Sequence, residues 1–323
     1  MPLSEFELID RFFRQLGARR ADVVLGVGDD AAVLAVPPGR QLVVTTDTLV
    51  EATHFPRGTA PRSIGHRALA VNLSDLAAMG AKPAWATLDL TMPRAEETWL
   101  AEFAAGLDAL ARANDVALVG GDTTSGPLCV SVTLLGFAGS GGYLARGGAA
   151  PGDHLFVSGS VGDAAAGLAI LKSRLGGGSA AARAELERRF LYPEPRVELG
   201  SRLIGVASAA IDISDGVAAD VEKLVRASGC GARIDAAQLP VSRALLECAG
   251  PDAARDFALT GGDDYELCFA VPAARLPLLG ERAPAARWPH REIGVLDATG
   301  RIEFRAGESL LAPSRPGYDH FAR

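Results

Sequence analysis

Apolar and polar positions alternate along the first half of the chain in blocks that predict strands and helices in turn. The stretch SEFELIDRFFRQL opens with a Ser4–Glu7 capping box and continues with amphipathic spacing, so we expect a helix over residues 4–16. The runs VVLGVGDDAAVLAV and QLVVTTDTLV are rich in β-formers, and a Pro-Pro-Gly turn separates them.

The same patterning continues with predicted helices over 61–79 and 95–113, each bounded by a cap or charge signal. Strands are predicted in AWATLDLTM, VALVGGD and LCVSVTLLGFAG. The order β-β-α-β-α-β indicates a compact α+β domain.

A glycine-rich stretch at 139–153, GSGGYLARGGAAPGD, indicates a boundary between an N-terminal domain (1–140) and a C-terminal domain (150–323). The second half predicts a strand at 154–158, a helix at 162–174, a surface loop in GGGSAAARA, then a strand, a tight Ser-Asp-Gly turn and a helix ending at Gly229. Further strands are expected at 231–235, 265–271, 291–296 and 302–305.

Composition narrows the function classes. The 323 residues carry a net charge of -7 and three lysines, without a basic block, so we expect no nucleic-acid partner. No apolar stretch has the length of a membrane span, so we expect no membrane partner. The start of the chain has no signal-peptide core, and the four cysteines show no C-x-x-C spacing, so a cytoplasmic protein with reduced thiols is expected.

Aspartates recur at the ends of apolar strands, and one more lies on a mostly apolar helix face. They are Asp29, Asp30, Asp47, Asp122, Asp212 and Asp215 at strand ends, and Asp75 on the helix. Each taken alone also fits a turn, a helix cap or a solvated surface. If the strand ends converge, several carboxylates meet with no lysine nearby, and bound Mg²⁺ would relieve their repulsion.

Neutral oxygens and backbone donors accompany these carboxylates. Thr45, Thr46 and Ser214 supply hydroxyl groups, and the helix after Ser214-Asp215 is expected to offer N–H groups to a phosphate. The stretch GVGDDA matches a dinucleotide fingerprint, but strand and turn follow it instead of a long helix. No lysine stands in a P-loop context, and no G-x-S-x-G hydrolase motif occurs. The pattern therefore favours metal-assisted phosphate chemistry.

Six motifs in order carry a family resemblance: GVGDDAAVL, TTDTLVEATHF, NLSDLAAMGAKP, GGDTT, ISDG and GGDDYEL. Together they resemble the thiamine-monophosphate kinase family, within the superfamily named for aminoimidazole ribonucleotide synthetase. The resemblance implies a two-domain PurM-like α+β / α/β fold, with a β-rich dimerising N-terminal domain, an α/β C-terminal domain and a site between them. It also implies transfer of the γ-phosphoryl group of ATP to thiamine phosphate, the last step of thiamine diphosphate synthesis, by a homodimer.

The resemblance further implies roles for individual residues. Several Mg²⁺ ions would be held by Asp30, Thr45, Thr46, Asp47, Asp75, Asp122, Asp212 and Asp215. ATP would contact Gly121, Asp122, Arg146 and Ser214, and thiamine phosphate would contact His54, Asp263 and Tyr318. No general base is assigned, because a phosphate oxygen is itself a nucleophile. The family's GGEDYEL is GGDDYEL here, so Asp263 is one methylene shorter than the usual Glu.

Plainer roles stay open for several of these residues: a surface arginine for Arg146, a structural imidazole for His54 and a packed tail residue for Tyr318. Other functions on the same fold are also open. A selenophosphate synthetase would carry a reactive cysteine near its N-terminal loop, whereas no cysteine precedes Cys129 here. A hydrogenase-maturation relative would end in cysteine, whereas this chain ends YDHFAR. A non-catalytic Mg-nucleotide regulator should have lost acidic ligands, and every matched position here keeps an acid or a hydroxyl group.

Overall fold

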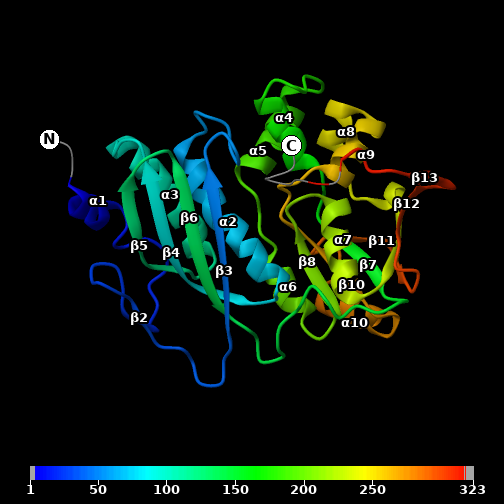
Figure 1. Cartoon of the computed structure of the whole chain (residues 1–323), viewed down its shortest axis with the longest axis horizontal. Helices are drawn as coiled ribbons and strands as arrows, with labels where there is room; N and C mark the ends of the chain where they lie inside the picture. Colours follow the sequence, from blue (N-terminus) through cyan, green and yellow to red (C-terminus); the bar gives the residue numbers. More distant parts are fainter. Residues whose placement is uncertain (1–3, 316, 318–323) are drawn as a thin grey trace. The chain divides into compact units, whose positions relative to one another are not determined.

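The computed structural model describes residues 4–315 and 317, and it divides into two compact units (Figure 1). The first unit consists of Met1–Leu76 and Ala81–Ser140, and the second of Ala77–Gly80 and Gly141–Arg323. Within the described residues, no helix is long and apolar enough to cross a membrane.

The first unit is built on a four-stranded sheet with the strand order β3-β6-β4-β5. The strands are β3 (Leu42–Val50), β4 (Lys82–Met92), β5 (Ala117–Ser125) and β6 (Cys129–Phe137). The β4–β5 pair is parallel and the other two pairs are antiparallel. This order leaves β3 and β5 at opposite edges of the sheet.

Two long helices, α2 (Pro61–Ala78) and α3 (Glu97–Ala113), lie behind this sheet (Figure 1). They approach closely because two glycines face carbonyl groups of the other helix. A Cβ at Gly65 would collide with the carbonyl of Phe103, and one at Gly106 with that of Arg62.

The first helix of the chain, α1 (Glu5–Phe12), has the predicted capping box but ends four residues before the predicted position 16.

The opposite face of the sheet is only partly covered. A short hairpin of β1 (Val23–Leu25) and β2 (Val33–Leu34) packs over Trp85 and Phe137. The β-rich run predicted over VVLGVGDDAAVLAV is strand only at its ends, since the GVGDDAA loop separates these two short paired segments, whereas the run QLVVTTDTLV is confirmed as β3. The rest of this face is open, and Val44 on β3 is 57% exposed.

The second unit contains a seven-stranded sheet with the order β13-β12-β9-β11-β7-β10-β8. Its strands are β7 (His154–Ser158), β8 (Ala209–Ile213), β9 (Gly231–Asp235), β10 (Glu266–Val271), β11 (His290–Asp297), β12 (Ile302–Ala306) and β13 (Ser309–Leu311). Among the described strands of this sheet, β9 and β12 are the one parallel pair. The strands predicted in this half are confirmed within a few residues, and β13 adds an edge that the sequence analysis did not predict.

Helices pack on both faces of this second sheet. α7 (Val217–Ser228) buries Val221 and Leu224 in a core with β7 and β8, and it ends at Gly229 as predicted. The other face is covered by α6 (Val197–Leu203) and α10 (Leu276–Arg282). Short 3-10 turns η1 (Ala236–Gln238) and η2 (Ala273–Arg275) connect neighbouring elements.

A separate helical cluster packs around its own small apolar core. It comprises α4 (Asp163–Leu171), α5 (Ala180–Leu191), α8 (Arg243–Ala249) and α9 (Pro251–Thr260). The surface loop predicted in GGGSAAARA is wrong in its second half, because Ser179 accepts the N–H of Ala182 and starts α5. The alanine-rich segment is a strong helix former, and the glycines before it obscured that signal.

Candidate active site

Three of the predicted metal ligands, Thr45, Asp47 and Asp75, meet in the first unit. Thr45 and Asp47 are two residues apart on β3, so both lie on the face that α2 covers. There Thr45 Oγ1 donates a hydrogen bond of 2.5 Å to Asp75 Oδ2. Burial, and then the nearby Asp75 carboxylate, raise the pKa of Asp47 to about 6. Two carboxylates and a hydroxyl in one half-buried space form a donor set that fits a hard divalent cation.

The remaining predicted residues of the first sheet lie elsewhere. Thr46 follows the alternation to the open face, where its hydroxyl bonds that of Thr133 at 2.7 Å. Asp122 on β5 is exposed and pairs in register with Asp89 on β4, which is exposed as well. Because β3 and β5 are opposite edges, about 14 Å of sheet separates Asp122 from Asp47. Beside Asp122, Gly121 packs against the Leu88 carbonyl, where a Cβ would collide.

Asp30 and His54 lie in loops with local hydrogen bonds. Asp30 is exposed, and its backbone N–H donates to Oδ1 of the preceding Asp29 at 2.8 Å. His54 follows β3, and its Nδ1 accepts the N–H of Val50 at 2.9 Å. The His54 imidazole thus has a turn-forming contact beside the role predicted for it, and the metal role of Asp30 stays a prediction.

In the second unit, the turn between β8 and α7 is organised by an aspartate that the sequence analysis missed. Asp220 Oδ2 accepts the N–H groups of Ser214, Asp215 and Gly216 at 2.9–3.1 Å. These three N–H groups belong to the turn before α7, and the expectation that α7 itself offers N–H groups to a phosphate stays a prediction. Asp215 also makes no side-chain cap to α7, which starts after Gly216 without one.

The expectation that no lysine lies near these carboxylates is wrong. Lys223 Nζ lies 2.5 Å from Asp215 Oδ2 and 2.7 Å from Asp220 Oδ1. One helical turn separates Lys223 from Asp220, so α7 presents both to the turn before it. The signal was present in the spacing D-x-x-K of the predicted helix. Lys223 thus serves as the counter-ion of this pair of aspartates.

The Gly261–Tyr265 loop lies directly against the same turn. The Asp263 N–H donates to the Ser214 carbonyl, and the Tyr265 N–H donates to the Ile213 carbonyl, both at 2.9 Å. Tyr265 Oη donates to Asp263 Oδ1 at 3.2 Å. The structure therefore brings the predicted acceptor-binding Asp263 next to the predicted ATP-binding Ser214.

Other predicted residues of this unit lie near the same strand. Asp212 is opposite Leu267 in the ladder, on the sheet face that α6 covers. Arg146 is exposed, and the Ala145 carbonyl beside it accepts the N–H of Ala210, four residues before Ser214. Tyr318 lies outside the described residues, whereas Gly317 lies against Ala219 and the Asp215 carbonyl.

Within residues 4–315 and 317, no group of three or more His, Cys, Asp or Glu side chains is placed to hold a metal ion. The predicted convergence of all eight metal ligands thus stays a prediction. Such sites need not be complete without substrate, because Mg²⁺ in phosphoryl-transfer enzymes takes oxygens from phosphates and water as well as one or two carboxylates.

Comparison with known proteins decides the family. Residues 28–138 match the N-terminal domain of the AIR synthase related proteins, and residues 150–307 match their C-terminal domain. The thiamine-monophosphate kinase of Escherichia coli strain K12 is 46% identical over 324 residues, covering 100% of this chain and 99% of that protein. The chain belongs to the thiamine-monophosphate kinase family. The predicted family and its two-domain PurM-like fold are confirmed.

Solved thiamine-monophosphate kinase structures agree with this assignment. The crystal structure from Stenotrophomonas maltophilia K279a superposes with a TM-score of 0.85 at 46% identity, covering 95% of this chain and 98% of that one. AaThiL complexed with AMPPCP and TMP superposes with a TM-score of 0.78 at 30% identity, covering 99% of each chain. Both cover the two units described above.

Proposed function

We propose that this protein is a thiamine-monophosphate kinase that transfers the γ-phosphoryl group of ATP to thiamine phosphate. A terminal phosphate oxygen of thiamine phosphate forms the new P–O bond as the bond to ADP breaks, giving thiamine diphosphate and ADP. The observation that carries the proposal is 46% identity over the whole chain to a thiamine-monophosphate kinase. The relative that binds AMPPCP and TMP together supports the same pair of substrates.

The carboxylates described above fit a magnesium-assisted version of this reaction. Asp47, Asp75 and Thr45 would hold Mg²⁺ in the first unit, and Asp215 would do so in the second. Bound Mg²⁺ would neutralise the phosphate charge, which is the main requirement of phosphoryl transfer. The chain itself positions the reactants, and no side chain needs to act as a general base. The exposed Arg146 guanidinium is suited to pair with phosphate oxygens.

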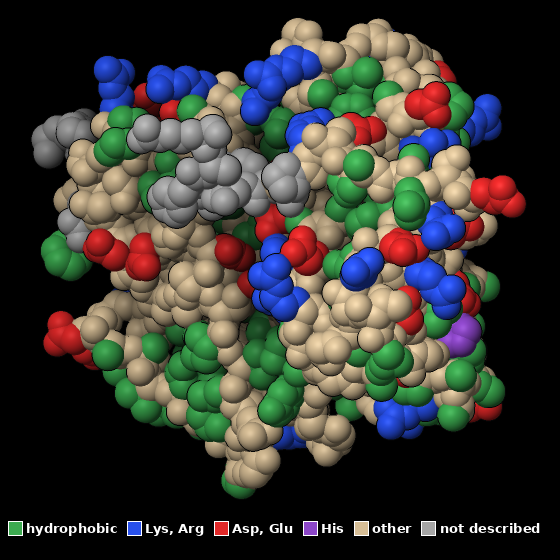
Figure 2. Space-filling model, turned by 45° about the vertical axis from the view of Figure 1, so that its right-hand side comes forward, with side chains coloured by type: hydrophobic (Ala, Val, Ile, Leu, Met, Phe, Trp, Pro, Cys, Tyr) green, Lys and Arg blue, Asp and Glu red, His purple; other side chains and the backbone are tan. Residues whose placement is uncertain are grey.

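The expected partners and location are part of the proposal. We infer a cytoplasmic homodimer that pairs through the open face of the first-unit sheet, where Val44 is 57% exposed and Thr46 and Thr48 are also exposed. We infer no nucleic-acid partner, because acidic and basic side chains are interspersed on the face that Figure 2 shows.

Product analysis tests the proposed reaction. Purified protein is incubated with ATP and Mg²⁺ plus either thiamine phosphate or thiamine, and the products are separated by chromatography. We expect thiamine diphosphate and ADP in equal amounts from thiamine phosphate, and no phosphorylated product from thiamine. ADP without thiamine diphosphate, or phosphorylation of thiamine, would refute the assigned acceptor.

Asp30→Asn tests the metal role predicted for the exposed first loop. We expect turnover to fall about 100-fold or more, as when a metal ligand shell is weakened. The free energy of unfolding should change by less than about 0.5 kcal/mol, because Asp30 is exposed. Asp29→Asn is the matched control and should keep most activity. Full turnover in Asp30→Asn would show that the ligand assignment is wrong.

A further inference from the structure

The loop beside the Ser214–Asp215 turn is held in a conformation that its residues disfavour. Asp263 has φ of +72° and Tyr265 has φ of +53°. Left-handed backbone is tolerated by aspartate but is unusual for a bulky aromatic residue. Only five non-glycine residues in the described part of the chain have positive φ, and two of them flank Asp264. Such strain persists only where the surrounding contacts enforce it.

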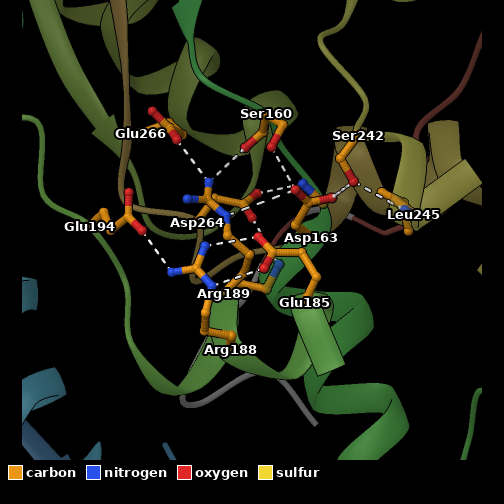
Figure 3. Close-up of polar contacts among 12 residues, drawn as sticks. Ser160, Asp163, Glu185, Arg188, Arg189, Glu194, Ser242, Leu245, Asp264 and Glu266 are labelled. Atoms are coloured by element: carbon orange, nitrogen blue, oxygen red, sulfur yellow. Dashed lines mark hydrogen bonds and ion pairs between the residues drawn. The ribbon is translucent and has the colours of Figure 1, made fainter. Parts of the chain in front are cut away.

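The carboxylate of Asp264 provides one such constraint. It is 3% exposed, and it accepts the N–H of Gly162 at 2.6 Å and that of Ala164 at 3.0 Å. Burial raises the pKa of Asp264, whereas the two N–H donors favour its charged form. Both oxygens are therefore tied to the start of α4, next to Asp163 and Ser160 (Figure 3).

The next buried acid, Glu266, anchors the loop where it enters β10. It is fully buried and accepts hydrogen bonds from Ser158, Arg189 and Arg196 at 2.5–2.8 Å. Gly159 packs against the same carboxylate so closely that a Cβ would collide with it. Buried charge bound by two guanidinium groups and a hydroxyl leaves Glu266 little freedom to move.

The opposite side of the loop is fixed by its own backbone. Asp263 and Tyr265 donate to the carbonyls of Ser214 and Ile213, and at Gly262 a Cβ would collide with the Ser214 carbonyl. The loop is thus clamped between α4 and the Ser214–Asp215 turn. Asp263, which is partly exposed, is the carboxylate that this clamp presents beside the turn.

We propose that Asp264 is a positioning residue for the acceptor substrate: by bonding Gly162 and Ala164 it forces Asp263 into left-handed backbone, where its carboxylate receives thiamine phosphate. This inference rests on the proposed function. The thiazolium ring of thiamine phosphate is cationic, so a carboxylate fixed beside it stabilises the bound acceptor. Because the clamp fixes the backbone of Asp263, it also fixes where this shorter carboxylate lies at a position where the family usually has Glu.

The test compares Asp264→Asn with Asp163→Asn. Asp163 is a matched control, because it is equally buried at the start of α4 but bonds Ser160 and Ser242 instead of the backbone donors that Asp264 binds. In Asp264→Asn an amide NH₂ faces one of the two N–H groups and leaves it without an acceptor. We expect the KM for thiamine phosphate to rise at least tenfold, or about 1.4 kcal/mol, with the KM for ATP within threefold of wild type.

Asp163→Asn should leave both KM values within threefold, even where it lowers the melting temperature. An equal rise of both KM values in Asp264→Asn, or a thiamine phosphate KM like that of Asp163→Asn, would overturn the positioning role. Absence of kinase activity in the wild type would instead overturn the proposed function.

A second pair of variants tests the clamp even if Asp264→Asn fails to fold. Asp263→Gly and Asp263→Ala both remove the carboxylate, but only glycine adopts φ of +72° without penalty. We expect Asp263→Gly to melt at a higher temperature than Asp263→Ala, with thiamine phosphate binding weakened at least tenfold in both. Equal melting temperatures would show that the backbone is not forced there and would refute the clamp.

Discussion

At the scale of single residues, the Asp47–Asp75 pair carries a pH dependence whose sign follows from its cause. The pKa of Asp47 is raised from 3.8 to about 6 by burial and by Asp75. Between these values the folded protein binds a proton that the unfolded chain has lost, so stability falls as pH rises from 4 to 6. The penalty is complete above pH 6 and amounts to about 2–3 kcal/mol. We expect Asp47→Asn to remove it.

Thermal unfolding in EDTA at pH 4.5 and pH 8 checks this prediction. Asp47→Asn should melt several degrees above wild type at pH 8, with little difference at pH 4.5. Asp89→Asn, which changes an exposed carboxylate on the open face, should follow wild type at both values. A lower melting temperature of Asp47→Asn at pH 8 would contradict the proposed repulsion.

Some contacts between single residues could be predicted from the sequence, and others could not. The place of Asp75 on a mostly apolar helix face predicted that something must compensate its carboxylate, and Thr45 does so. Strand alternation also contained the signal that Thr46 faces away from Asp47. The separation of Asp122 from Asp47 was not readable, because it depends on the order of strands in the sheet and not on any local pattern.

At the scale of elements, Asp220 and Lys223 on α7 both form hydrogen bonds with the Ser214–Gly216 turn that precedes this helix. Lys223 bonds both Asp215 and the buried Asp220, whose carboxylate also holds three N–H groups. Lys223→Met leaves Asp220 without its ammonium partner, so we expect a loss of about 1–3 kcal/mol in the free energy of unfolding. Mg²⁺ should shrink this loss, because a divalent cation at Asp215 replaces the missing positive charge.

Urea unfolding in EDTA and in Mg²⁺ measures both effects. The matched control is Arg226→Met, which removes an 81% exposed guanidinium paired with Glu222 on the same helix and should cost under about 0.5 kcal/mol. A Lys223→Met variant as stable as Arg226→Met in EDTA would show that the lysine is not the counter-ion of this turn.

Elements with a strong period of their own were predictable, and those defined by neighbours were not. β7 to β12 and α7 follow apolar runs with clear stop signals, so their positions matched the prediction. In the helical cluster, α5, α8 and α9 were not predicted, and the small core of the cluster is shared among elements distant in sequence. Its short helices carry weak individual periodicity, and only their mutual packing defines them.

For the whole molecule, six motifs in order were enough to predict family and fold, because together they sample both sheets and the turns that follow them. The motifs did not predict which acidic side chains hold the backbone in place. Asp220 and Asp264 are such cases. Each satisfies backbone donors from a neighbouring segment, and no sequence pattern names its partner.

The open face of the first-unit sheet leads to a prediction about assembly. Val44 is 57% exposed on β3 opposite Leu135, and the next residues on the same face of β3 are Leu42 and Thr46. An uncovered sheet face of this kind favours association with a second copy. We expect the wild type to sediment at twice the 33.4 kDa of one chain and Val44→Arg to sediment as a monomer, because paired faces would bury the guanidinium without a partner. Leu246→Arg, at a 43% exposed position on α8, should remain dimeric. Sedimentation equilibrium at micromolar concentration distinguishes these outcomes, and a dimeric Val44→Arg would place the interface on another surface.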